Sequence, residues 1–214
     1  MDESDVEALA RLHVACLSDS LVTTLGARYA RSFYRYVTQS TREVIVTERD
    51  AAGHIVAAAV ITLEPSTFYR RLALHTSLLP SLVWNIRVMP ALLWSSLRRS
   101  DLPRDTRDPP AESPRPEMIL IFTAPDVRRQ GHAGAIVRRA EHRLGQLGIP
   151  AYQVRTVLSP SNEALAFYRD LRFVPSGTSV RFGVRFQIFT KRLSDGQATA
   201  GATGPAEGSA GHTR

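Results

Sequence analysis

A short stretch between an apolar run and an amphipathic segment combines the residue types that bind anions. Arg128 and Arg129 precede Gln130 and Gly131, and Gly134 follows three residues later. Arginine makes charge-assisted hydrogen bonds to phosphate oxygens, and glycine lets a phosphate approach the backbone because it has no Cβ. The unpaired N–H groups of a following helix would also favour negative charge. The pattern therefore predicts a phosphate-binding turn or, as the plainer alternative, a tight connection with solvated arginines.

The segments on either side of this turn must position it. Residues 118–123 form an apolar run typical of a strand, and a helix is predicted from about Ala133 until Gly148 ends it. Its apolar residues recur at helical spacing: Ala133, Ile136, Val137, Ala140, Leu144 and Leu147. No Gly-Lys-Ser/Thr follows, and three glycines at dinucleotide-fingerprint spacing are absent. The turn therefore differs from both of those phosphate loops.

The hydrophobic periodicity of the rest of the chain predicts an α+β fold, that is, a mixed α/β arrangement of helices and strands. Helices are expected at 5–17, from after Gly26 to about Val37, and at 163–170, and strands at 43–48, 54–63, 117–123, 151–157, 173–174 and 179–191. An antiparallel hairpin directly after two helices excludes a plain alternating βαβ layout. We expect one domain over residues 1–193 and a disordered tail over 194–214, which is rich in Gly, Ala and Thr.

Residues 66–116 are expected to form an insertion between two neighbouring strands. Its first part, 68–97, is apolar and helical in propensity, with Pro80 and Pro90 dividing it, and a Pro-rich charged loop follows. The insertion could cap a pocket, complete the core as a helical layer, or provide a homodimer interface. Residues 66–100 could also form a peripheral membrane contact. Charged residues and prolines within 72–94 argue against a transmembrane span.

Composition excludes several classes of protein. The 214-residue chain has a formal charge of +7, yet Lys191 is its only lysine and the arginines are scattered. That distribution argues against a dedicated nucleic-acid surface. Cys16 is the only cysteine, so no internal disulfide forms, and no metal site is expected. The acidic N-terminus lacks the pattern of a signal peptide, and we expect a cytoplasmic protein.

Two stretches together resemble the signature regions of the GNAT superfamily of acyl-CoA N-acyltransferases. Residues 125–134 resemble the first region, whose Arg/Gln-x-x-Gly-x-Gly/Ala core is matched by Arg128, Gly131 and Ala133. The resemblance covers about residues 5–192 outside the insertion. It implies a GNAT-like central, mostly antiparallel sheet flanked by helices, with an apolar helical insertion between two strands.

The second region is similar to residues 162–173, where an asparagine leads through an alanine-bearing helical turn to Phe-Tyr and then Phe173. Asn162 stands six residues before Tyr168, whereas the family spacing is seven, and Ser161 occupies the expected offset. The resemblance therefore implies a cofactor contact from Asn162 or Ser161. Arg172 replaces the glycine that usually precedes the phenylalanine.

The resemblance implies acetyl-CoA as co-substrate. The pyrophosphate would lie in a cradle of N–H groups from Arg129, Gln130, Gly131, His132, Ala133 and Gly134. Arg128 and Arg129 would add charge-assisted bonds. The pantetheine arm would pair like a strand with the backbone of Ile121, Phe122 and Thr123, where one N–H would polarise the thioester carbonyl.

Two catalytic residues are predicted. Tyr168 matches the family's general acid, and the alternative is a core aromatic residue beside Phe167. Glu117 begins the central strand where several relatives carry a carboxylate that acts as base, through water. The equally plain alternative for Glu117 is an exposed residue at the start of a strand.

The leading hypothesis is an acetyl-CoA-dependent N-acetyltransferase acting on the primary amine of a small molecule, with amino sugars among the candidates. The acetyl group would move by direct attack through a tetrahedral intermediate. The alternatives are acetylation of a protein N-terminus or lysine, and a non-catalytic acyl-CoA-binding module that recruits a partner or membrane through its insertion. Candidate acceptor-pocket residues are Asp19, Tyr34, Glu64, Phe68 and Tyr69.

Overall fold

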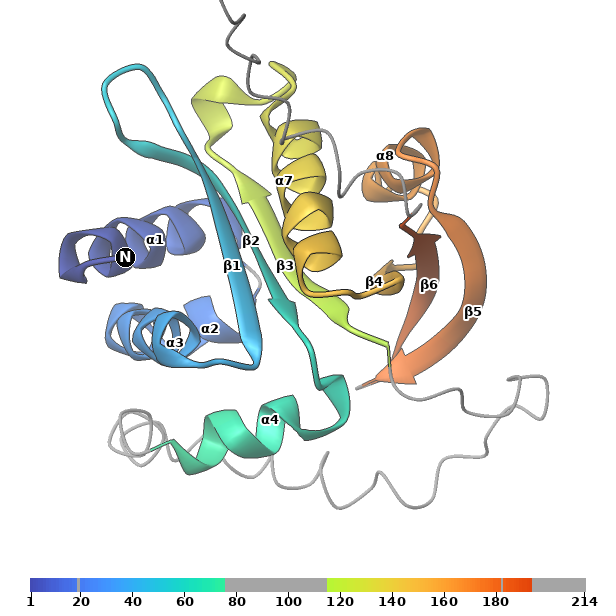
Figure 1. The fold of residues 1–214 in the computed structure, drawn as a ribbon, viewed down its shortest axis with the longest axis horizontal. Helices are drawn as coiled ribbons and strands as arrows, with labels where there is room; N and C mark the ends of the chain where they lie inside the picture. The colour runs from blue at the N-terminus through green and yellow to red at the C-terminus, as the bar shows by residue number, and fades with distance from the viewer. Residues whose placement is uncertain (19, 76–114, 182, 194–214) are drawn as a thin grey trace, which may run out of the picture.

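A six-stranded sheet forms the centre of the computed structural model, which describes residues 1–18, 20–75, 115–181 and 183–193 (Figure 1). Its strands are β1 (Glu43–Arg49), β2 (Ile55–Thr62), β3 (Glu117–Thr123), β4 (Ala151–Val157), β5 (Val174–Arg181) and β6 (Val184–Arg192). Their order across the sheet is β1-β2-β3-β4-β6-β5. The β3–β4 pair is parallel and the other neighbours are antiparallel, which confirms the mostly antiparallel prediction.

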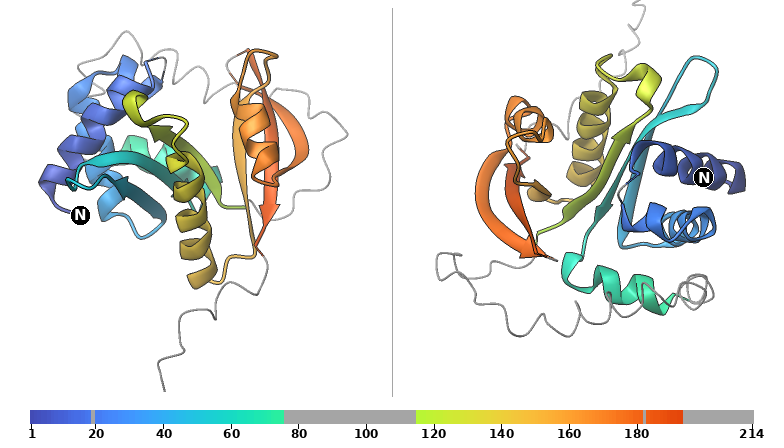
Figure 2. Two further views of the ribbon diagram at one scale, coloured as in Figure 1. Left: turned by 90° about the horizontal axis from the view of Figure 1, so that it is seen from above. Right: turned by 180° about the vertical axis from the view of Figure 1, so that it is seen from behind.

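Helices cover both faces of this sheet. The first face is covered by α1 (Glu3–Cys16), α2 (Leu21–Thr24), α3 (Ala27–Gln39) and α4 (Pro65–Leu74). The opposite face is covered by α7 (His132–Gln146) and α8 (Ala164–Asp170). Figure 2 shows these layers, with α1 and α3 against the β1–β3 half and α7 across the sheet from them. Two hydrophobic cores result, one on each face.

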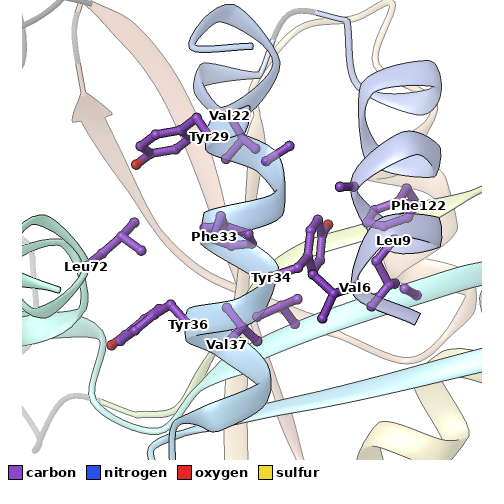
Figure 3. Packing of buried hydrophobic residues seen from close by; sticks show 14 of the residues in the cluster. Val6, Leu9, Val22, Tyr29, Phe33, Tyr34, Tyr36, Val37, Leu72 and Phe122 are labelled. Carbon is purple, nitrogen blue, oxygen red and sulfur yellow. The ribbon is translucent and has the colours of Figure 1, made fainter. Parts of the chain in front are cut away.

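The first core explains why α3 forms where it does. Its apolar side is entirely buried and packs on α1, α4 and the sheet, as Figure 3 shows. The buried residues of α3 are Tyr29, Ala30, Phe33, Tyr34, Tyr36 and Val37. Sequence periodicity predicted this face but missed the separate short helix α2, whose N-terminus is capped by Ser20. Gly26 separates α2 from α3 with φ of +90°, a conformation that glycine adopts without a Cβ clash.

A bulge and a divergence make β3 the strand that positions the site. Leu120 pairs with Val60 and Met118 with Ile61, so Ile119 is the extra residue of a bulge. β3 pairs with β4 at only two positions, Glu117 with Gln153 and Met118 with Val154. Beyond Met118 the two strands separate, and the left view of Figure 2 shows them diverging. The sheet is therefore open on the β4 side of β3.

Most predicted elements are confirmed, and some bounds are wrong. β3 and β4 have the predicted bounds. The strand predicted at 179–191 is wrong, because its residues are divided between the end of β5 and β6, and β5 already begins at Val174. The first helix of the insertion is α4, which begins at Pro65 and ends at Leu74. The rest of the predicted helical insertion, and so most of the proposed dimer or membrane contact, lies outside the described residues. The predicted tail 194–214 lies outside them too.

None of the helices within the described ranges is long and apolar enough to cross a membrane.

Candidate active site

The open edge of β3 exposes backbone groups that a sheet would normally pair. The N–H of Ala124 donates to the carbonyl of Val56 at 2.8 Å, and Phe122 is in register with Ala58. In an antiparallel ladder such bonds alternate, so the backbone groups of Phe122 point toward β2. Those of Ile121 and Thr123 point toward the gap between β3 and β4.

This alternation refines the prediction for the three strand residues. The backbone groups of Phe122 pair with β2, and its side chain is buried in the first core. Ile121 can pair with an added extended chain through both of its backbone groups. Thr123 can do so through its N–H, because its carbonyl already accepts from Cys16 and Arg128. An extended amide-bearing ligand would pair there as a further strand does, through backbone hydrogen bonds.

The turn after β3 has the backbone form of an anion site. A single 3-10 turn, Pro125–Val127, is followed by Arg129 with φ of +63° and Gly131 with φ of +88°. Gly131 is the N-cap of α7 and offers no side chain to cap it, and the first turn of α7 contains no acidic residue. The N–H groups of residues 132–134 therefore lack a side-chain cap at the positive end of the helix dipole. These features suit a pyrophosphate.

The arginines of the turn are exposed, and one of them bends back over the strand. Nε of Arg128 donates to the carbonyl oxygen of Thr123 at 3.4 Å, and Cys16 Sγ donates to the same oxygen at 3.4 Å. Burial raises the pKa of the Cys16 thiol, although the neighbouring Arg128 guanidinium opposes the shift. The end of α1 and the phosphate turn therefore meet at the open end of β3.

Asn162 ties the end of β4 to the start of α8. Its Nδ2 donates to Thr156 Oγ1 at 2.9 Å and to the carbonyl of Val157 at 2.6 Å. Its Oδ1 accepts from the N–H of Ala164 at 3.1 Å. Ser161 is exposed, with its hydroxyl 3.0 Å from that of Ser159. Asn162 thus has a structural role here, and the cofactor contact from either residue stays a prediction.

Tyr168 is buried in the second core, on the face of the sheet that α7 covers. Its ring is only 4% exposed and contacts the rings of Phe173 and Phe189, with centroids at 5.4 and 5.8 Å. Met118 and Val154, the last paired residues of β3 and β4, belong to the same core. Burial raises the pKa of Tyr168, so its phenol stays protonated at neutral pH. The ring packs as a core aromatic residue, and its role as acid stays a prediction.

Glu117 lies at the closed end of β3. It accepts from Gln153 Nε2 at 3.1 Å and from the Arg155 guanidinium at 3.2 Å. Glu117 is 5% exposed, so the alternative of an exposed strand-start residue is wrong. The physical reason is the parallel pairing with β4, which brings Gln153 and Arg155 alongside the carboxylate. Its role as base stays a prediction.

A buried histidine is the feature that sequence reasoning did not assign a role. Nδ1 of His13 lies 2.7 Å from the Tyr34 hydroxyl, and Nε2 lies 2.7 Å from Ser20 Oγ. Burial lowers the pKa of His13 to about 4. Its place on the apolar face of a helix was visible in the sequence, but a partner 21 residues away was not.

The predicted acceptor-pocket residues are only partly brought together. Tyr34 and Phe68 are fully buried core residues, so they do not line a pocket. Glu64 is engaged by Arg42 and Arg71, and Tyr69 is exposed. Asp19 lies outside the described residues.

The gap between β3 and β4 and the turn that follows β3 have a geometry that suits an extended, phosphate-bearing ligand. The model of the Acetyltransferase (GNAT) family matches residues 7–173. The chain belongs to this family and is an acetyl-CoA-dependent N-acetyltransferase. The sequence resemblance to the family is thereby confirmed.

Solved structures of GNAT proteins share the fold at low sequence identity. The ribosomal-protein-S18-alanine N-acetyltransferase of Escherichia coli is 13% identical with a TM-score of 0.55, and 91% of each chain is covered. A histone acetyltransferase HPA2 and related acetyltransferase from Corynebacterium glutamicum is 15% identical with a TM-score of 0.55, covering 91% of this chain and 94% of that one.

A third similar structure is the spermidine/spermine N-acetyltransferase SpeG of Vibrio cholerae. It is 11% identical with a TM-score of 0.52, and 90% of this chain and 89% of that chain are covered. A comparison with curated protein sequences finds no match. At these identities the likeness establishes the fold and leaves the acceptor open.

Proposed function

We propose that this protein transfers the acetyl group of acetyl-CoA to a primary amine of a small molecule, by direct attack through a tetrahedral intermediate. The observation that carries the proposal is the continuity of two features. The open backbone edge of Ile121 and Thr123 leads directly into the uncapped N-terminus of α7. An extended thioester arm and a pyrophosphate require those two features in that order.

Residues of this chain would hold the co-substrate at both ends. The N–H groups of residues 129–134 and the guanidinium groups of Arg128 and Arg129 would bind the pyrophosphate. The edge formed by Ile121 and Thr123 would pair with the pantetheine amides. One N–H of this edge would stabilise the oxyanion that develops on the thioester carbonyl, an effect of about 3–4 kcal/mol.

Tyr168 is proposed to protonate the leaving thiolate. A tyrosine has an ordinary pKa of about 10, above that of a thiol, and burial keeps the Tyr168 phenol protonated until the reaction needs it. Glu117 is proposed to accept the amine proton through water. Glu117 and Met118 are the residues of β3 that pair with β4, so the carboxylate belongs to the strand just before β3 leaves β4.

The acceptor proposed is a small amine, with amino sugars as one candidate class. One similar structure is a ribosomal-protein-S18-alanine N-acetyltransferase and another is a spermidine/spermine N-acetyltransferase, so fold likeness favours neither kind of acceptor. A protein acceptor and a non-catalytic acyl-CoA-binding module are the competing outcomes of the test below.

The test is thiol release from acetyl-CoA in the presence of an amine panel. The panel holds amino sugars, polyamines, amino acids, and peptides with a free N-terminus or a lysine. We expect turnover with at least one small amine and none with the peptides. Turnover with peptides alone would replace the small-molecule acceptor by a protein. Acetyl-CoA binding without any turnover would indicate a binding module, and no binding at micromolar concentration would remove the site assignment.

A further inference from the structure

A chain of buried hydrogen bonds joins the first three helices. Tyr34 on α3 and Ser20 at the N-cap of α2 lie 2.7 Å from the two ring nitrogens of His13 on α1. Ser20 Oγ continues to Thr23 Oγ1 at 3.0 Å, and Thr23 Oγ1 donates to the carbonyl of Leu17 at 2.7 Å. His13 and Tyr34 are both fully buried.

The partners determine where each hydrogen lies. Thr23 gives its hydrogen to the carbonyl of Leu17, so Ser20 donates to Thr23. Ser20 Oγ then accepts from Nε2–H of His13, and Nδ1 accepts from the hydroxyl of Tyr34. With these hydrogen positions, both ring nitrogens of His13 and the three hydroxyl groups each have a hydrogen-bond partner. The opposite tautomer would leave the Tyr34 hydrogen with no other acceptor among the described residues.

This tautomer excludes one tempting role. A serine hydroxyl 2.7 Å from an imidazole resembles a nucleophile beside its base. Here Nε2 carries the hydrogen and donates to Ser20, so it cannot take the serine proton. Burial, which lowers the pKa of His13 to about 4, also makes the ring a weak base. The chain therefore orders side chains and does not generate a nucleophile.

The chain touches the strand proposed to hold acetyl-CoA. The rings of His13 and Phe122 have centroids 5.6 Å apart, and Cys16, three residues later on α1, donates to the carbonyl of Thr123. Figure 3 shows Tyr34 in the space between α3 and α1, close to Phe122. The α7 N-terminus, which would hold the phosphates, belongs to the other face of the sheet. The end of α1 therefore contacts this end of β3 from the face of the sheet opposite α7.

We propose that His13 is a positioning residue for acetyl transfer: its imidazole holds Ser20 and α2 against α3, and so fixes the end of α1 beside Thr123, on the face of the sheet to which the proposal assigns the amine. The proposal rests on the proposed function. It assigns to His13 no contact with acetyl-CoA or with the acetyl group. It therefore predicts a change in the handling of the amine with little change in the handling of acetyl-CoA.

The kinetic test compares two tyrosines of α3. Tyr34→Phe removes the donor to His13. Tyr36→Phe removes a hydroxyl that accepts from Arg71 and takes no part in the hydrogen bonds around His13. With the best amine of the panel, Tyr34→Phe should raise the KM for the amine about tenfold and leave the KM for acetyl-CoA within about twofold. Tyr36→Phe should change neither. An equal rise in both KM values, or no rise, would overturn the proposal.

Rescue at the histidine provides the second variant. Gln has a neutral amide with one donor and one acceptor group, so His13→Gln should restore much of the amine KM that His13→Ala loses. We expect about a threefold rise for His13→Gln against more than tenfold for His13→Ala. Equal losses in the two folded variants would contradict a role for hydrogen bonding.

NMR spectroscopy tests the hydrogen bonds around His13 without a measurement of turnover. The 15N shifts of His13 in the full protein should report a neutral ring with its hydrogen on Nε2. The amide of Thr23, which donates to Ser20 Oγ, should exchange at least about tenfold faster in Tyr34→Phe than in Tyr36→Phe. A hydrogen on Nδ1, or equal exchange, would overturn the positioning role. If no amine of the panel is acetylated but the spectra are as expected, the proposed function is overturned and the assigned hydrogen bonds of His13 are retained.

Discussion

The two ends of β3 are both extended backbone, and they differ in strand pairing and in the side chains that contact them. At Glu117 the strand is paired on both sides, and its carboxylate is held by Arg155 and Gln153. At Thr123 the strand is paired only with β2, and cationic and thiol groups gather at its carbonyl. One end is closed by internal partners, and the other is the end at which we propose that acetyl-CoA binds.

The difference shows how one strand serves both stability and binding. A buried charge is costly unless it is paired, so the closed end gives Glu117 an arginine partner. A ligand-binding edge must keep its backbone groups available, so β4 leaves β3 after Met118. The bulge at Ile119 lies at that change. Substitutions at the closed end should therefore lower the free energy of unfolding, whereas substitutions at the open end should weaken binding or activity.

The largest expected effect is at the closed end. Arg155→Met leaves the buried Glu117 carboxylate without its cationic partner, which should cost about 3–5 kcal/mol of unfolding free energy. Urea denaturation measures it. The added change Glu117→Gln should restore most of the loss because the unpaired charge is gone. Arg35→Met, which breaks an exposed pair with Glu3, is the matched control and should cost less than about 1 kcal/mol. A loss equal to the control would contradict the closed-end role.

The next effect is a pH dependence beside the open end. Burial lowers the pKa of His13 from 6.5 to about 4, so the unfolded chain binds a proton before the folded chain does. The stability that this group contributes is complete above pH 6.5 and is lost as the pH falls toward 4, by about 3 kcal/mol in total. His13 faces Tyr34 and Ser20, and Cys16 and Arg128 lie beyond them. Denaturation of the wild type and of His13→Gln between pH 7 and 4 should show a steeper loss for the wild type, and parallel curves would refute the assignment.

A third effect tests chemistry in the second core. Tyr168→Phe should lower kcat by about 100-fold or more because it removes the proposed acid, while the KM for acetyl-CoA changes little. The ring stays, so the core around Phe173 and Phe189 should keep its stability. Tyr152→Phe is a control in the same core, since its hydroxyl donates to Glu141 and has no proposed catalytic role. Unchanged kcat in Tyr168→Phe would remove the acid assignment.

The smallest effect sharpens the open end. Gly131→Ala places a side chain at φ of +88°, which costs roughly 1–2 kcal/mol, and should weaken acetyl-CoA binding about tenfold by calorimetry. Gly145→Ala, on the same helix with no atom near its Cβ position, should leave binding unchanged and slightly raise stability. Equal binding by both variants would separate Gly131 from the phosphate site.

The parts of the fold that could be predicted are those encoded by neighbours in the chain. The apolar run of β3 and the helical spacing of α7 each depend on residues within one element, and both elements were found. Gly131 was also recognisable, because a turn between strand and helix demands its backbone freedom. Helix α2 was missed because its four residues carry no periodicity.

The sequence by itself determined the family signature, the glycine-containing turn between strand and helix, and the order of the elements. Only the tertiary structure decided the partners: Arg155 for Glu117, Tyr34 and Ser20 for His13, and β2 for the backbone of Phe122. Periodicity records which side of an element is buried, and it carries no record of which distant residue meets that side. Glu117 and Arg155 are 38 positions apart, and only the parallel pairing of β3 with β4 brings them together.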